Sequence, residues 1–448
     1  MIVVVGGGPA GRYAAMQLAG AGKEVLLVDK RSDGLGGQCL HQGCMVICAL
    51  NDVARTMEHQ EMLFRSGIIA TSPVPDYTAL IAKMREIIET IAGIIAKETS
   101  TAGVKVVKAE AHIDGRTVII NDERFQPEAI IIATGTHPRR LNVPGKDLPG
   151  VMTAHTFFSL PSLPRELVII GGGVIAAEIA YIYSLLGSAV TILARSTLLK
   201  EFPEVLAHEA KKELHRVTIQ EQVVVSRIVG DDHVSGVEIK TSDGFRIIKA
   251  DTVLVAAGTE AEIRTITGIP LTPGGFIRIN ERMETEIPGV YAVGDVTGTS
   301  SLTPVARWQG RTAADVILGG EPPSPLLTVP QAIKLRNDLA FCNHHDQGGM
   351  KVTMTSPAGP GSFWAVPERA TGKASMTTDP DSGEIIGMFE ASPYASVIAA
   401  YHALLINTGI SIDVMKQFIE VHPSADATGW IGRYLAEKID KKKQIRSL

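Results

Sequence analysis

VVVGGGPAG, residues 3–11, is the stretch that decides the fold of this chain. A short apolar, β-branched run leads into a G-x-G-x-x-G pattern, a helical run follows, and the next apolar strand ends at Asp29. In such a unit Gly6 makes the tight turn, Gly8 lets a pyrophosphate approach the backbone, and Gly11 permits close helix–strand packing. Asp29, roughly 20 residues on, can accept hydrogen bonds from a ribose hydroxyl, while the helix N-terminus favours phosphate charge. The pattern predicts a dinucleotide-binding domain.

The same pattern recurs at GGGVIA, residues 171–176, again between an apolar strand and a helix. The strand that follows, residues 189–193, runs into Arg195 and has no acid at its end. An acid there would favour NAD, whereas its absence, with Arg195 and Lys200 nearby, favours the 2′-phosphate of NADP. The alternative for Arg195 is a solvated loop residue. We therefore predict a second nucleotide site that prefers NADPH, with NADH possible.

Two of the four cysteines, Cys39 and Cys44, lie in GGQCLHQGC, residues 36–44, with four residues between them. In a reducing compartment, paired cysteines are more often catalytic or metal-binding than structural. Their place just after a nucleotide-binding turn favours a dithiol that exchanges electrons with a flavin. Cys44 also precedes a helical run, residues 45–53, whose dipole would stabilise a thiolate.

Composition narrows the classes of protein. The 448 residues carry a net charge of −5, which argues against a nucleic-acid partner, since such partners usually need a basic face. No apolar run approaches the roughly 18 residues of a membrane span, and residues 87–96 are interpreted as an amphipathic helix. The first residues read as a strand and not as a signal peptide. We expect a cytoplasmic protein without a membrane or nucleic-acid partner.

Three further motifs follow in order: ATG at residues 133–135, YAVGD at 291–295 and LTPVA at 302–306. Together with the two glycine turns and the cysteine pair, they resemble the FAD-dependent pyridine nucleotide–disulfide oxidoreductases, a family that includes dihydrolipoyl dehydrogenase, glutathione reductase and mercuric reductase. The resemblance implies an α/β fold with two Rossmann-like dinucleotide-binding domains plus a C-terminal α+β dimerisation domain. The implied parts are an FAD-binding domain in two segments, an NAD(P)-binding domain between them, and an interface domain: residues 1–148 and 259–325, 149–258, and 326–448.

The resemblance also implies roles for individual residues. Cys44 would be the thiol beside the flavin and Cys39 the interchange thiol that faces the substrate. His422, in EVHPS at residues 420–424, would be the acid–base group, reaching into the partner subunit's site of a homodimer. The alternative for His422 is a surface or capping residue before a proline.

We predict no metal site. The residues that the glycine turns and the resemblance assign to binding FAD and NAD(P)H are Gly6, Gly8, Pro9, Gly11, Asp29, Lys30, Gly37, Ala111, Thr134, Gly135, Gly171, Gly173, Val174, Ile175, Glu178, Arg195, Lys200, Gly258, Gly294, Asp295, Pro304 and Val305.

The chain departs from the family pattern at two places near the expected site. Cys48 stands where the family has a lysine, so Glu178, the expected partner of that lysine, loses its cation. We expect Cys48 to be a small buried residue, with a third redox thiol as the alternative. The glutamate that usually follows the histidine is Ala427 here, and Asp426, one residue earlier, either substitutes for it or is solvated.

The predicted activity is electron transfer from NAD(P)H through flavin and the Cys39–Cys44 dithiol to a small disulfide or a lipoyl-type substrate. One alternative is a flavin oxidoreductase that passes electrons to a quinone, a metal or dioxygen. Another is a non-catalytic, redox-sensing flavoprotein. The chain end carries no cysteine pair, which argues against mercury as substrate. In the last domain we expect strands over residues 351–355, 373–378 and 385–389, and helices over 394–408 and 412–420.

Overall fold

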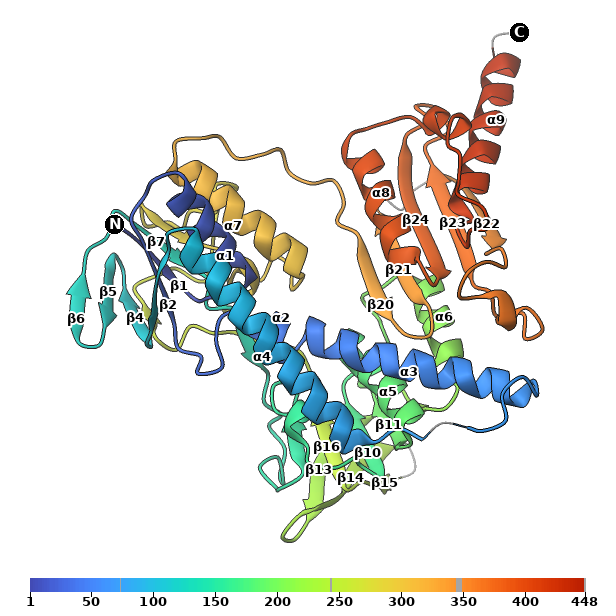
Figure 1. Ribbon diagram of the computed structural model, residues 1–448, viewed down its shortest axis with the longest axis horizontal. Coiled ribbons are helices and arrows are strands. Elements are labelled where there is room, and N and C mark those ends of the chain that lie inside the picture. Colours follow the sequence, from blue (N-terminus) through green and yellow to red (C-terminus); the bar gives the residue numbers. More distant parts are fainter. Residues whose placement is uncertain (73, 242–243, 344–348, 447–448) are drawn as a thin grey trace. The chain divides into compact units, whose positions relative to one another are not determined.

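The computed structural model describes residues 1–72, 74–241, 244–343 and 349–446 (Figure 1). The chain divides into two compact units, which are described separately. The first unit contains Met1–Ala49, Pro75–Gly171 and Val225–Pro325, and the second contains Leu50–Val74, Gly172–Val224 and Leu326–Leu448. The four-part domain organisation drawn from the family resemblance stays a prediction.

A parallel sheet forms the centre of the first unit. Its strands, in the order β19-β7-β1-β2-β3, are Val290–Ala292, Ala129–Ile132, Ile2–Val5, Val25–Asp29 and Lys105–Lys108. All four strand pairs are parallel. Figure 1 shows two helices, α1 (Pro9–Gly20) and α7 (Thr303–Ile317), side by side over this sheet.

Successive side chains of β1 point to opposite faces of this sheet, and all of them are apolar, so both faces are covered. Ile2 and Val4 belong to the apolar core that includes side chains of α1 and α7. Val3 and Val5 point to the other face, into a core shared with β4 (Ala111–Asp114) and β5 (Thr117–Ile120). A strand buried on both faces is typical of parallel sheets in α/β proteins, so the predicted Rossmann-like arrangement is confirmed.

The first unit also contains smaller sheets. A four-stranded sheet has the order β18-β4-β5-β6, a pair joins β8 and β17, a parallel set joins β10, β16 and β9, and an antiparallel ribbon includes β13, β14 and β15. The bounds not yet given are β6 Glu123–Phe125, β8 Thr136–Pro138, β9 Val151–Thr153, β10 Glu166–Ile170, β13 Val224–Gly230, β14 Val234–Thr241, β15 Gly244–Lys249, β16 Thr252–Val255, β17 Thr259–Ala261 and β18 Ile266–Thr267.

The remaining helices of the first unit include a short one that carries the first cysteine of the pair. These helices are α2 Gly37–His41, α4 Tyr77–Thr101, η1 Phe157–Ser159 and η2 Gly294–Thr297. The helix expected over residues 87–96 lies within α4, whose N-terminus is capped by Asp76. Across the part of the chain that the structure describes, we find no helix with the length and apolar character needed to cross a membrane.

The second unit begins within α3 (Cys44–Arg65) and continues with elements that follow the second glycine turn. These elements are α5 Val174–Leu186, β11 Ala189–Leu193, α6 Glu204–Glu213 and β12 Thr218–Gln220, and β11 pairs in parallel with β12. The helix α5 is almost entirely buried, as its composition of Ala, Ile, Leu and Tyr leads one to expect.

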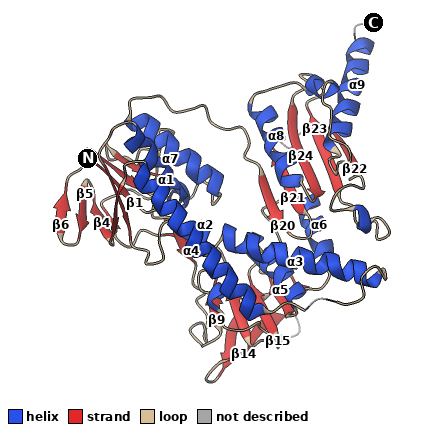
Figure 2. Cartoon of the chain, viewed as in Figure 1, coloured by secondary structure: helices blue, strands red, loops and turns tan. Residues whose placement is uncertain are grey.

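The C-terminal part of the second unit is an antiparallel sheet with helices packed on it (Figure 2). The sheet order is β20-β21-β24-β23-β22, with α8 on β21 and β24 and α9 on β22 and β23. The bounds are β20 Gln331–Lys334, β21 Asp338–Asn343, β22 Met350–Thr355, β23 Lys373–Thr378, β24 Ile385–Ser392, α8 Ala395–Asn407, α9 Thr428–Arg446, η3 Phe363–Ala365 and η4 Ile412–Lys416.

The three predicted strands and the first predicted helix of this region are confirmed, but the helix over residues 412–420 is wrong. Only the 3₁₀ turn η4 forms there. The chain leaves the turn because Phe418 points inward, where its ring stacks on Tyr401 with centroids 5.9 Å apart. Gly429 leaves room for that ring, since a Cβ at position 429 would lie 2.7 Å from it.

Candidate active site

The first glycine turn is closed by Asp29 at the end of β2. One oxygen of its carboxylate accepts the N–H of Gly7 (2.5 Å) and the other accepts the N–H of Arg31 (2.8 Å). Gly6 has a φ of +110°, and a Cβ there would lie 2.2 Å from the carbonyl oxygen of Ala133. A Cβ on Gly8 would meet nothing closer than 3.8 Å, so the backbone stays open on the side from which a phosphate would approach.

Polar groups around this turn fit an extended polar cofactor such as FAD. The Thr134 hydroxyl is buried and has no hydrogen-bond partner among the described residues. Asp295 lies in η2, and burial, followed by the charge of Cys44, raises the pKa of its carboxyl to about 6. Gln309 fixes the adjoining loop, because its side chain accepts the N–H of Gly294 (2.7 Å) and donates to Thr299 (2.7 Å). The buried Thr134 hydroxyl and the half-buried Asp295 carboxyl suit the ribityl hydroxyls of FAD.

Other residues that the sequence assigns to cofactor binding also lie in the first unit. Lys30 forms ion pairs with Glu110 (3.3 Å) and Glu262 (3.8 Å). Ala111 is buried in β4, and Gly258 has a φ of +99°. Gly135 accepts the backbone N–H of Glu262 through its carbonyl.

Cys39 and Cys44 are brought together at the junction of α2 and α3. Cys39 lies in α2, Cys44 is the first residue of α3, and their thiols are hydrogen-bonded to each other. The helical run predicted after Cys44, residues 45–53, is confirmed and lies within α3. The Thr303 hydroxyl at the start of α7 lies 3.4 Å from the Cys44 sulfur.

This arrangement shifts the pKa values of the two thiols in opposite directions. The hydrogen bond from Cys39, then that from Thr303, and the charge of Arg307 lower the pKa of Cys44 to about 6. The same hydrogen bond and burial raise the pKa of Cys39. In the reduced pair at neutral pH, Cys44 is therefore the thiolate and Cys39 retains the proton, so Cys39 needs a base before it can attack.

Sequence reasoning missed a residue between the two cysteines, His41. Its ring is nearly buried and lies between the Leu35 carbonyl oxygen (Nε2, 3.1 Å) and the Asp33 carboxylate (Nδ1, 3.4 Å). Asp33 also accepts hydrogen bonds from Arg31. These contacts hold α2 at its C-terminal end, and only the position of His41 inside the cysteine spacing could have drawn attention to it.

Cys48 corrects a prediction. We expected a buried residue, but the Cys48 side chain is exposed on α3. Val46 and Leu50, with no exposed surface, take the buried face of the helix instead. A helix places residues four apart on one face, so a residue midway between two buried positions points away from the core.

The second glycine turn has the geometry of a nucleotide-binding turn. A Cβ at Gly171 would lie 2.2 Å from the Ala256 carbonyl oxygen, whereas a Cβ at Gly173 would meet nothing within 4 Å. Val174 and Ile175 follow as the first residues of α5. The loop after β11 is fastened to the turn by a hydrogen bond from the Leu199 N–H to the Gly172 carbonyl (2.6 Å).

Arg195 and Lys200 both lie in that loop and are both exposed. The loop is further held because Glu221 accepts the N–H of Leu198 (2.6 Å) and pairs with Lys211 (2.7 Å). Two exposed cations on an ordered loop beside a glycine turn form a surface suited to an anionic group.

Glu178, expected to lose its cation, has a backbone donor. It is buried in α5 and accepts the N–H of Lys334 (2.8 Å). The Lys334 ammonium donates instead to Ser396 (2.6 Å) and to Asp338. A main-chain amide thus satisfies one oxygen of the carboxylate that the family pattern pairs with a lysine.

His422 and Asp426 take separate places. The His422 side chain is exposed. Asp426 accepts hydrogen bonds from the Tyr401 hydroxyl (2.7 Å), the Thr428 N–H (2.7 Å) and the Thr428 hydroxyl (2.5 Å), and so caps the start of α9. No hydrogen bond or ion pair joins Asp426 to His422 among the described residues. Asp426 is engaged in the fold, a use that neither sequence alternative anticipated.

A buried acid, Glu390, lies under this segment. It has no exposed surface, and neither of its carboxyl oxygens makes a hydrogen bond of good geometry within the described part of the chain. Burial, followed by the negative charge of Asp426, raises the pKa of Glu390 to about 8. Near neutral pH it is therefore mostly the uncharged acid. The apolar residues that predict this strand give no indication from the sequence that Glu390 is buried and mostly uncharged.

We expect Glu390→Gln to stabilise the protein at high pH. The raised pKa means that the folded state holds a proton that the unfolded chain releases near pH 4.3, so stability is greatest below that pH and is lost as pH rises towards 8. Glutamine mimics the neutral acid and does not titrate. Urea unfolding should show the variant at least about 2 kcal/mol more stable than wild type at pH 9, with a smaller difference at pH 5.

The exposed Glu384, at the turn before β24, provides the matched control as Glu384→Gln. Its unfolding free energy should follow that of wild type across the same pH range. Parallel pH curves for Glu390→Gln and wild type would show that Glu390 titrates normally.

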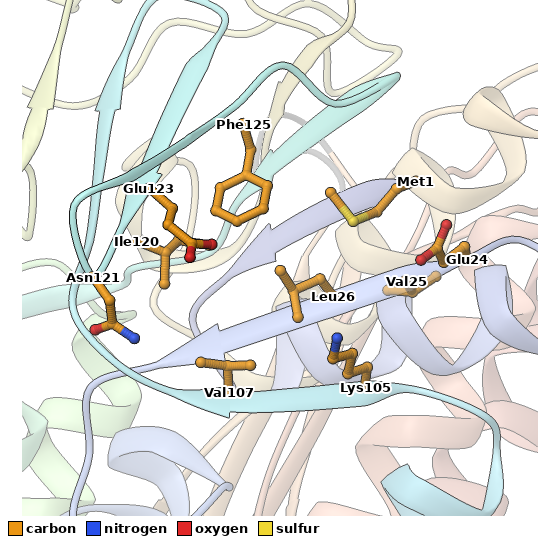
Figure 3. A pocket seen from close by; sticks show the side chains of 10 residues that line it. All are labelled: Met1, Glu24, Val25, Leu26, Lys105, Val107, Ile120, Asn121, Glu123 and Phe125. Carbon is orange, nitrogen blue, oxygen red and sulfur yellow. The ribbon is translucent and has the colours of Figure 1, made fainter.

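A separate hollow of about 280 Å³ lies between β2, β3 and the β5–β6 hairpin (Figure 3). Leu26, Val107 and Phe125 line it, with Glu24, Lys105 and Glu123 at its edges. None of the predicted site residues contributes to it.

Comparisons with known proteins agree with this geometry. Residues 1–310 match the pyridine nucleotide-disulphide oxidoreductase family. Dihydrolipoyl dehydrogenase of Bacillus subtilis is 27% identical over 445 residues, covering 95% of this chain and 96% of the relative. That of Buchnera aphidicola subsp. Schizaphis graminum is 31% identical over 340 residues, covering 71% and 69%. The structure of the HOCl-induced flavoprotein disulfide reductase RclA from Escherichia coli shares the fold, with a TM-score of 0.83, 22% identity and 98% of each chain covered.

The chain belongs to the pyridine nucleotide-disulphide oxidoreductase family. This confirms the family that its motifs predict, and with it the reaction class, transfer of electrons from NAD(P)H to a disulfide. The family is FAD-dependent, and its nucleotide substrates are NAD(H) or NADP(H).

Proposed function

We propose that this protein is a cytoplasmic, homodimeric reductase that uses NADPH in preference to NADH and acts on a small disulfide or a lipoyl-type substrate. The observation that carries the proposal is the polarised pair of thiols, with Cys44 as the thiolate and Cys39 as the protonated partner, beside the first glycine turn. Exchange with a disulfide uses such a pair, one thiol to attack the substrate and one to resolve the mixed disulfide. A redox-sensing pair can share this pKa difference, so turnover with a disulfide decides between the two functions.

FAD, when bound, would take up two electrons from the nicotinamide and make them available to the dithiol. The groups suited to hold it are the Gly6–Gly8 backbone, the Thr134 hydroxyl and the Asp295 carboxyl. The groups suited to hold the nicotinamide dinucleotide are the Gly171–Gly173 backbone with Arg195 and Lys200.

The chain's own residues would carry out the exchange in two steps. Cys39, once deprotonated, attacks one sulfur of the substrate disulfide, forming a mixed disulfide and releasing the first thiolate. The Cys44 thiolate then attacks the Cys39 sulfur, forming the Cys39–Cys44 disulfide and releasing the second thiolate. The two leaving thiolates take up protons, and the substrate gains the two electrons that the dithiol loses.

His422 of the partner subunit would accept the Cys39 proton and return it to a leaving thiolate. A homodimer would bring it to the site, and the C-terminal region offers apolar side chains for such an association. On α8, Val397 is 70% exposed and Leu404 is 63% exposed, and Trp430 on α9 is 56% exposed. Exposed apolar side chains of this size on both helices favour an interface.

The experiment that tests the proposal is anaerobic reduction by NADPH and NADH in parallel, followed by turnover with lipoamide, oxidised glutathione and cystine. The proposal expects rapid reduction by NADPH and turnover with at least one disulfide. Reduction of a quinone or of dioxygen with no disulfide turnover would favour the flavin oxidoreductase alternative. No reduction by either nucleotide would favour the redox sensor.

We expect Arg195→Ser to raise the KM for NADPH at least about tenfold, because a charge-assisted contact to the 2′-phosphate contributes about 1.5–3 kcal/mol. The KM for NADH should change less than about twofold, since NADH lacks that phosphate. Steady-state kinetics with both nucleotides provide the measurement. The surface cation Lys212, paired with Glu209 in α6, provides the control variant Lys212→Ser. Equal effects on both nucleotides would contradict the NADPH preference.

A further inference from the structure

We propose that Arg307 is a positive charge that, together with the hydrogen bonds from Cys39 and Thr303, favours the deprotonated form of Cys44 in the reduced dithiol, and so is a positioning residue for the exchange reaction. The proposal rests on the proposed function, because it matters only if the dithiol turns over. It goes further by placing the cation on α7, at a position that neither the motifs nor the family pattern assigns.

Close packing fixes the position of α7 against α1. Gly310 lies where a Cβ would meet the Ala10 carbonyl oxygen at 2.2 Å, so the two helices approach with no side chain between them. Gln309, the preceding residue, is buried and bonded to the loop that holds Asp295. Close backbone contact and a buried hydrogen bond leave α7 little freedom to slide.

This packing places one face of α7 next to the dithiol. Thr303, in the first turn, places its hydroxyl 3.4 Å from the Cys44 sulfur. Arg307 follows four residues later and therefore lies on the same face, one turn further along. A guanidinium at this position faces the same part of the molecule as the hydroxyl that touches Cys44.

The Arg307 guanidinium is itself held in place. It lies over the ring of Tyr13 on α1, 5.6 Å from the ring centroid. The Arg12 guanidinium lies at the same distance from that ring, and Arg12 is buried and bonded to Thr99 (2.9 Å). A cation positioned by an aromatic ring keeps its charge, whereas a carboxylate partner would neutralise it.

Arg307 is a positive charge in a neighbourhood of Cys44 that also contains a negative one. Asp295 on η2 brings a negative charge close enough to affect Cys44, and Cys39 on α2 donates a neutral hydrogen bond. Position 48 on α3, where the family pattern has a lysine, is a cysteine. The charge of Arg307 acts on both thiols and favours their ionised forms. A nearby opposite charge favours the ionised form of a thiol.

The test is the pH dependence of Cys44 alkylation in the reduced holoenzyme. Iodoacetamide reacts with the thiolate, and tandem mass spectrometry measures its addition at Cys44 separately from Cys39 and Cys48. We expect Arg307→Met to slow Cys44 alkylation at pH 6 about three- to tenfold, the change produced by raising a pKa by roughly half to one unit. Arg307→Lys should restore at least half of the wild-type rate.

The matched control is Arg311→Met, which removes the same charge from the same helix one turn further on, where the side chain is exposed. Its alkylation profile should stay within about twofold of wild type. An Arg307→Met profile that coincides with wild type overturns the proposal, as does an equal effect of Arg311→Met. Bound flavin and circular dichroism identify a variant that has lost its fold, in which case the Arg307→Lys and Arg307→Gln profiles decide.

Failure of the proposed function is recognisable separately. Alkylation of Cys44 requires no disulfide turnover, so a wild-type enzyme that reduces no disulfide contradicts the proposed function while the Arg307 measurement still stands. An enzyme that reduces disulfides but whose alkylation ignores Arg307 contradicts only the present inference.

Discussion

Cys39→Ser is expected to lower turnover of a small disulfide at least about a thousandfold, because a hydroxyl cannot form the mixed disulfide through which exchange proceeds. NADPH should continue to support reduction of a quinone, since that reaction requires no sulfur–sulfur bond. Steady-state assays of both activities on the same preparation, with bound flavin measured in parallel, provide the test. The ratio of the two activities is the informative quantity, because it cancels differences in active fraction.

Cys48→Ser is the matched control for this experiment, since Cys48 is an exposed thiol one turn into the same helix that begins with Cys44. It should leave both activities within about twofold of wild type. Disulfide turnover that survives in Cys39→Ser would contradict the assignment of Cys39 as the interchange thiol. If Cys48→Ser instead abolished turnover, the third cysteine would have to enter the mechanism.

Asp426→Ala is expected to lower the free energy of unfolding by about 2–4 kcal/mol. Loss of the side-chain acceptor for the first N–H of α9 costs about 1 kcal/mol, and the Tyr401 hydroxyl, left without its acceptor in a part-buried site, adds a further 1–3 kcal/mol. Asp426→Asn should cost less, because the amide oxygen still accepts a hydrogen bond from the Thr428 N–H. Urea unfolding at pH 7 provides the measurement.

The control is Asp440→Ala on the same helix, which removes only an exposed ion pair with Lys416. Such pairs contribute about 0–1 kcal/mol, so this variant should remain close to wild type. If Asp426→Ala were as mild as Asp440→Ala, Asp426 would not anchor the start of α9. The acid would then be available for the catalytic role that its place near His422 first suggested.

Local sequence patterns were sufficient to predict the secondary structure around both nucleotide sites. A strand, a glycine turn and a helix involve neighbouring residues, so Gly6 and Gly171 could be placed without knowledge of the rest of the chain. The same applies to Cys44 at the start of a helix. The helix predicted over residues 412–420 is wrong because Phe418 packs on the Tyr401 ring. This contact with a residue distant in the sequence outweighs the local helical propensity.

By itself the sequence determined the family, the order of its motifs and the pair of thiols that would carry electrons. Only the tertiary structure decided which groups surround those thiols. Thr303 meets Cys44 across 259 residues, and Arg307 follows it on the same helix face. Asp426 is committed to Tyr401 and α9, and Glu178 to the Lys334 amide. The reason is physical: a motif reports the backbone conformation of adjacent residues, whereas the charge and hydrogen bonds that set a thiol's pKa come from whichever distant elements pack against it.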